Sequence, residues 1–134
     1  MDENSQMAIK LQHIDHIALT VRDVAASTRW YCDVLGFEHR FPGLWDGVPA
    51  MLFIGDTGLA LFPVSSDDPA SPPGSDTIAV MHVAFRVNRE AFQTAQDDLR
   101  SRGIAFNFQD HDISHSIYFY DPDGHQLEIT TYEI

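Results

Sequence analysis

The two halves of this chain resemble each other weakly at an offset of 66 residues. Shifting the sequence by this offset aligns pairs of identical residues that include His16 with His82, Ala18 with Ala84, Val21 with Val87, Phe53 with Phe119, Gly58 with Gly124 and Leu61 with Leu127. A repeat of this kind is typical of a fold that uses one structural unit twice. The sequence therefore predicts two related modules.

The expected order of helices and strands repeats as well, as βαβββ in each half. The hydrophobic pattern of the first half predicts a strand over 16–21, a helix over 24–35, and a hairpin of strands over 50–54 and 59–64. The second half predicts strands over 81–87 and 104–108, a helix over 89–102, and a hairpin over 116–120 and 126–132. Each helix has a polar N-cap, Asp23 or Asn88, and a glycine stop, Gly36 or Gly103.

The predicted organisation is a single α+β domain. It divides into a flexible lead-in over 1–12, a first module over about 13–64, a linker over 65–76 and a second module over about 77–134. The linker is rich in Pro, Ser, Gly and Asp. One such module is too small to bury both faces of its sheet. The modules are therefore expected to pair around a pseudo-twofold axis into a cupped mixed β-sheet.

Two histidines and a glutamate are candidate metal ligands. His16 and His82 are equivalent in the repeat, so the pairing of modules is expected to bring them face to face. Glu128 lies in an otherwise apolar strand, where a carboxylate is costly unless a cation compensates it. One divalent metal bound by these three residues would leave positions open for substrate. The offset aligns Glu128 with Phe62, which has no ligand atom, so a fourth protein ligand is not expected.

Composition restricts the partners that this chain can have. It carries 20 acidic and only 8 basic residues, for a formal net charge of −12. Nucleic acid and membrane surfaces are therefore not expected partners, and the first ten residues lack the apolar run of a signal peptide. The single cysteine, Cys32, cannot form an intramolecular disulfide, which is typical of a cytoplasmic protein. A small-molecule substrate remains as the expected partner.

Three segments carry a family resemblance: IDHIALTV with the following RDVAASTRWYCDVLGF, then MHVAFRV, then SIYFYDPDGHQLEITTYE. Together they resemble the vicinal-oxygen-chelate superfamily, which includes glyoxalase I, extradiol dioxygenases, fosfomycin thiol transferases and bleomycin-resistance proteins. The resemblance implies a glyoxalase-like fold of paired modules and a homodimer. It also implies a metal held by a histidine on the first strand of each module and an acidic residue on the last, the places of His16, His82 and Glu128.

The last segment also resembles the signature of extradiol ring-cleaving dioxygenases, from His111 through Tyr118 to Glu128. This resemblance implies two catalytic residues. Tyr118 would hydrogen-bond substrate or oxygen, and His111 would be a nearby acid or substrate contact. The implied metal is Fe(II), and the implied substrate is a catechol-like aromatic.

Two other activities stay open. The same segment is similar to fosfomycin thiol transferases, so a thiol transferase, lyase or isomerase that uses Mn, Ni, Zn or Mg is the alternative. A metal-free protein that sequesters an aromatic drug or metabolite is the third possibility. The sequence also leaves open whether the site forms within one chain or across a dimer.

Overall fold

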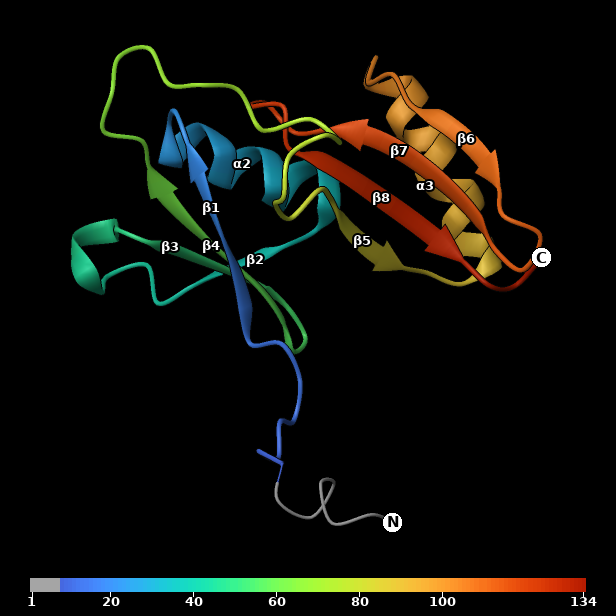
Figure 1. Cartoon of the computed structure of the whole chain (residues 1–134), viewed down its shortest axis with the longest axis horizontal. Coiled ribbons are helices and arrows are strands. Elements are labelled where there is room, and N and C mark those ends of the chain that lie inside the picture. The colour runs from blue at the N-terminus through green and yellow to red at the C-terminus, as the bar shows by residue number, and fades with distance from the viewer. Residues whose placement is uncertain (1–7) are drawn as a thin grey trace.

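The computed structural model describes residues 8–134, which form two four-stranded sheets with one long helix each (Figure 1). The first module contains β1 (His16–Val21), α2 (Val24–Leu35), β2 (Glu38–Arg40), the short 3-10 helix η1 (Trp45–Gly47), β3 (Ala50–Ile54) and β4 (Thr57–Pro63). The second contains β5 (Val83–Arg86), α3 (Arg89–Ser101), β6 (Asn107–Asp110), β7 (His115–Tyr120) and β8 (Gln126–Thr131). The predicted α+β fold of two paired βαβββ modules is confirmed.

The strand order is the same in both sheets. It is β1-β4-β3-β2 in the first and β5-β8-β7-β6 in the second. The first strand of each module pairs in parallel with the last, and the remaining pairs are antiparallel. The weak sequence repeat therefore reflects a repeated topology.

Local signals set the ends of both helices. The side chain of Asp23 accepts a hydrogen bond from the Ala26 amide, and Gly36 ends α2 in the left-handed conformation with φ of 76°. Asn88 caps α3 in the same way, by accepting from the Ala91 amide. These are the caps and bounds that the sequence predicted, except that α3 ends at Ser101.

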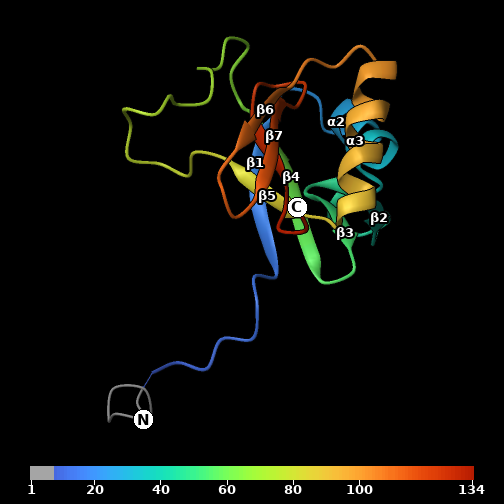
Figure 2. The same cartoon turned by 90° about the vertical axis from the view of Figure 1, so that its right-hand side faces the viewer.

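Helices and core lie on one side of the sheets. In the side view, α2 and α3 cover one face, and the segment that connects the modules, residues 64–82, lies on the other (Figure 2). Side chains such as Tyr31, Leu52, Phe119 and Leu127 are buried in the core. We call the side of the sheets without helices the open face.

A turn of the second module fastens the two modules together. The buried Tyr31 of α2 donates a hydrogen bond from its hydroxyl to Asp121, over 2.6 Å. Arg22 forms an ion pair with Asp123 at 3.1 Å, and the His125 ring hydrogen-bonds the Thr20 carbonyl at 2.9 Å. The β7–β8 turn is therefore a clamp between modules as well as a chain reversal.

Some strand bounds differ from the expectations. The strand expected over 104–108 begins at Asn107, because the Ile104 amide bonds the Leu99 carbonyl and so closes the end of α3. Of the expected lead-in, residues 1–7 lie outside the described residues, and residues 8–12 form no helix or strand. No helix in the described part of the chain has the length and apolar character needed to cross a membrane.

Candidate functional site

Strand alternation places a row of polar side chains on the open face of the second sheet. Leu127 and Ile129 of β8 point into the core, so Glu128 between them lies on the opposite face. The sheet register sets Tyr118 of β7 directly across from Glu128 on one side and Ala84 of β5 on the other. The polar residues of this row are therefore neighbours in space.

His82 and Glu128 form the centre of the row. His82 Nε2 lies 3.0 Å from Glu128 Oε1, and the Glu128 side chain is only 10% exposed. Two ligands that bind one cation at right angles, each over about 2.1 Å, are about 3.0 Å apart. The spacing and donor types of this pair therefore fit a divalent metal.

Ser116 holds the other oxygen of the same carboxylate. Its Oγ donates to Glu128 Oε2 over 2.6 Å and lies 2.9 Å from Thr130 Oγ1. Hydrogen bonds of this kind orient a carboxylate ligand and are typical support for a metal site. Ser116 was not among the residues predicted from the sequence, although it lies on the same face of β7 as Tyr118.

Tyr118 and His111 form a second polar pair beside the first. The Tyr118 hydroxyl lies 3.1 Å from His111 Nε2, and the Tyr118 ring stands edge-on to His82 with centroids 5.8 Å apart. Burial, followed by the negative charge of Glu128, raises the pKa of Tyr118 above its ordinary value. The hydroxyl therefore keeps its proton at neutral pH and can act as a hydrogen-bond donor.

His16 does not reach this cluster within the chain. It lies at the start of β1, its side chain is 43% exposed, and its Nδ1 is 2.8 Å from Asp15 Oδ2. Among residues 8–134, no group of three or more His, Cys, Asp or Glu side chains could hold a metal ion. Within these residues, His16 therefore does not join His82 and Glu128 in one metal-binding group.

The sheet register also corrects the counterpart of Glu128 in the first module. With His16 aligned to His82, Ala84 corresponds to Ala18, and Ala18 pairs with Ala60. The counterpart is therefore Ala60 rather than Phe62. Because alanine has no ligand atom, the expectation of no fourth protein ligand is unchanged.

His115 lies on the wrong side of the sheet for this site. It alternates in phase with the buried Ile117 and Phe119, on the face covered by α3. Its ring contacts Phe108, with centroids 5.1 Å apart, and its Nε2 lies 3.6 Å from Asp110. Because side chains alternate between the two faces of a strand, His115 and Tyr118 face opposite sides of β7. This difference in facing can be read from the sequence.

Comparisons with known proteins agree on a family. The model of the Glyoxalase/Bleomycin resistance protein/Dioxygenase superfamily matches residues 13–129. Glutathione transferase FosA from Serratia marcescens is 31% identical over 119 residues, which cover 89% of this chain and 80% of that protein. Catechol-2,3-dioxygenase from Bacillus subtilis is 26% identical, over 87% of this chain but only 40% of that protein.

Solved structures agree with the fold. The crystal structure of a glyoxalase/dioxygenase from Nostoc punctiforme superposes with a TM-score of 0.78 at 26% sequence identity. The match covers 92% of both chains. Both modules of this chain thus have counterparts in an experimentally determined structure.

Proposed function

Because this chain belongs to the Glyoxalase/Bleomycin resistance protein/Dioxygenase superfamily, we propose that it is a metal-dependent enzyme whose small-molecule substrate chelates the metal. The observation that carries the proposal is the His82–Glu128 pair, with its 3.0 Å spacing on the open face. A buried carboxylate beside an imidazole is costly to keep without a compensating cation. Ser116 supports the proposal, because it fixes the orientation of the carboxylate.

The third ligand in this proposal is His16 of a second copy of the chain. His16 is exposed on β1, on the same face as Ala18 and Thr20. A partner chain can therefore approach it without displacing the core. The protein would act as a homodimer in which each metal is held by His16 of one copy and by His82 and Glu128 of the other.

The reaction class that we favour is oxygen-dependent cleavage of a catechol-like aromatic, with Fe(II) as the metal. A divalent cation at this position would supply Lewis-acid and oxygen chemistry to a chelated substrate. The chain itself supplies proton control. Tyr118 donates a hydrogen bond to a substrate oxygen, and His111, whose Nε2 lies 3.1 Å from that hydroxyl, is the acid or substrate contact beside it.

Metal-assisted thiol transfer is the second candidate. It is favoured by the extent of the match, because this chain covers 80% of glutathione transferase FosA but 40% of the catechol dioxygenase. This candidate uses the same His82 and Glu128 ligands. It differs in needing no oxygen and in requiring a thiol cosubstrate.

Metal binding tests the shared part of both candidates. Glu128→Gln and His82→Ala should each weaken anaerobic Fe(II) and Mn(II) binding by more than about 100-fold, since loss of an outer-shell partner alone costs about 10- to 100-fold. His39→Ala, at an exposed position of β2, is the matched control. Metal binding that is equally weak in wild type and all variants would refute the proposal.

Oxygen uptake separates the two reactions. Iron-loaded protein should consume oxygen in the presence of a catechol, and Glu128→Gln should abolish this uptake. Turnover of an epoxide with a thiol, without oxygen uptake on any catechol, would establish thiol transfer instead. Tight binding of an aromatic compound without any turnover would favour sequestration.

A further inference from the structure

The residues before β1 have the pattern of a strand but belong to no strand in the described part of the chain. Residues 8–14, which we call the arm, alternate Ile9 and Leu11 with Lys10 and Gln12. Ile9 is 85% exposed and Leu11 is 86% exposed. Figures 1 and 2 both show the arm running away from the two sheets. Large apolar side chains exposed in such an alternating segment indicate that another surface covers them.

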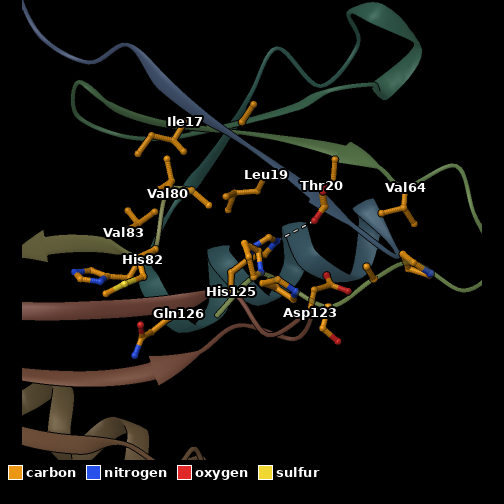
Figure 3. A pocket seen from close by; sticks show the side chains of 18 of the residues that line it. Ile17, Leu19, Thr20, Val64, Val80, His82, Val83, Asp123, His125 and Gln126 are labelled. Atoms are coloured by element: carbon orange, nitrogen blue, oxygen red, sulfur yellow. Dashed lines mark hydrogen bonds between the residues drawn. The ribbon is translucent and has the colours of Figure 1, made fainter. Parts of the chain in front are cut away.

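An apolar groove lies between the two modules, with a volume of about 500 Å³. The start of β1 and the β3–β4 turn line one side of it, and residues 83–87, which include β5, line the other. Ile17 of β1 and Val83 of β5, both labelled in Figure 3, line it from opposite modules. β1 and β5 are edge strands of their sheets. Edge strands carry backbone groups that can pair with an added strand.

The lining of this groove suits apolar side chains. Among the described residues that line it, only Thr57 and Arg86 have polar side chains. The Arg86 guanidinium already lies over the Tyr132 ring, 4.6 Å from its centroid. A cavity of about 150 Å³ accommodates benzene. The groove therefore has room for the side chains of both Ile9 and Leu11.

The arm is poorly placed to enter the groove of its own chain. The Asp15 carbonyl is packed so closely against β4 that a Cβ on Gly58 would collide with it. A return to the groove would therefore need a chain reversal over residues 12–14, which are Gln, His and Ile. None of these is a residue type that favours tight turns. The groove of a second copy requires no such reversal.

We propose that the arm of each chain docks as an added strand in the groove between the modules of a second copy, with Ile9 and Leu11 against its apolar lining. An exchange of two arms has the symmetry of a twofold homodimer. The arm leads through Asp15 into His16, so the same partner chain supplies both the arm and that ligand. The inference rests on the homodimer of the proposed function, but not on its metal.

Isotope-mixed cross-linking on the metal-free full chain tests the inference. The photoreactive residue p-benzoylphenylalanine replaces Leu11, and equal amounts of unlabelled and nitrogen-15-labelled chains are refolded together before irradiation. The expected products join position 11 of one copy to residues 54–59 or 83–87 of the other, as mass spectrometry of the digest would show. The same photoreactive residue in place of Gln12, on the other face of the arm, should give fewer of these products.

Sedimentation equilibrium measures the contribution of the arm to association. Leu11→Lys places a charge on the docked face of both arms, so the dissociation constant of the dimer should rise by at least about 100-fold. Gln12→Lys introduces the same charge on the opposite face and should change this constant by less than about threefold. Ile54→Lys, at a groove position that is 45% exposed, should act like Leu11→Lys from the receiving side.

Cross-links that form only within one copy would overturn the inference, because the arm would then dock on its own chain. Products that join position 11 to other segments, an absence of products, or equal dissociation constants for Leu11→Lys and Gln12→Lys would overturn it as well. A dimer whose arm lies elsewhere would leave the homodimer of the proposed function standing. A failure to bind metal together with the expected cross-links would refute the proposed metal site and support the docking of the arm.

Discussion

Tyr118 lies among the groups that determine its chemistry. Glu128 is directly across the sheet, the His82 ring stands edge-on to it, and His111 bonds its hydroxyl. Partial burial, followed by the charge of Glu128, raises the pKa of the hydroxyl and keeps it protonated. Tyr118 is therefore suited to donate a hydrogen bond rather than to act as a base.

Tyr118→Phe should lower kcat by about 100-fold, as expected for the loss of one proton-handling group. Metal affinity should stay unchanged, because the hydroxyl is not a ligand in this proposal. Steady-state oxygen uptake with a catechol, together with metal titration, measures both effects. Tyr120→Phe, on the same strand and face and 60% exposed, is the matched control.

The pH profile gives an independent check on this role. Burial raises the pKa of Tyr118 above its ordinary value, so the hydroxyl should keep its proton as the pH rises from 7. The ratio of wild-type to Tyr118→Phe rates should accordingly stay constant up to about pH 9. A ratio that falls toward one below that pH would show that the hydroxyl acts in another way.

At the scale of elements, the β7–β8 turn links folding to the site. Asp121 is buried, and its Oδ1 accepts hydrogen bonds from the Asp123 and His125 amides while its Oδ2 accepts from Tyr31. The turn leads directly into β8, which carries Glu128. Module packing and ligand position therefore depend on the same side chain.

Tyr31→Phe should reduce the free energy of unfolding by about 2–3 kcal/mol, because it leaves a buried carboxylate oxygen without its donor. Urea denaturation measures the change. Tyr132→Phe, at a position that is 49% exposed, should have little effect. Equal stability of the two variants would mean that the Tyr31–Asp121 hydrogen bond contributes nothing to the fold.

Alkaline pH should weaken the clamp in a predictable direction. Burial, followed by the charge of Asp121, raises the pKa of Tyr31. The unfolded chain releases this proton near its ordinary value of about 10, whereas the native state retains it. Stability should therefore fall as the pH rises above about 10, and the fall should be smaller in Tyr31→Phe.

At the scale of the whole molecule, a single chain leaves many large apolar side chains exposed to solvent. Large apolar side chains that are at least half exposed include Trp45, Val80 and Met81. The open face carries no helix (Figure 2). Among residues 8–134, only His82 and Glu128 of the candidate ligands lie together. A second copy would bury apolar surface and supply His16.

Complementation between two inactive variants tests this arrangement. His16→Ala and Glu128→Ala should each lose tight metal binding. A refolded equal mixture should recover about a quarter of the wild-type sites, because half of the dimers are mixed and each has one intact site. Metal titration and sedimentation measure the outcome. No recovery in a mixture that forms dimers would place the whole site within one chain.

The sequence by itself determined the features that depend on near neighbours. The caps at Asp23 and Asn88 set the helix starts, and the 66-residue repeat gave the two modules. Strand alternation along β7 also encodes the opposite facing of Tyr118 and His115, although this difference was not predicted. Such features follow from backbone geometry within a few residues, so periodicity and turn residues encode them.

Only the tertiary structure decided which residues from distant parts of the chain come into contact. The 3.0 Å contact of His82 with Glu128, the support from Ser116 and the Tyr31–Asp121 clamp join residues that are distant in sequence. Sheet register made Ala60 the counterpart of Glu128. Within residues 8–134, the structure does not group His16 with His82 and Glu128. Register and module packing arise from the summed burial of both sheets, which no local pattern specifies.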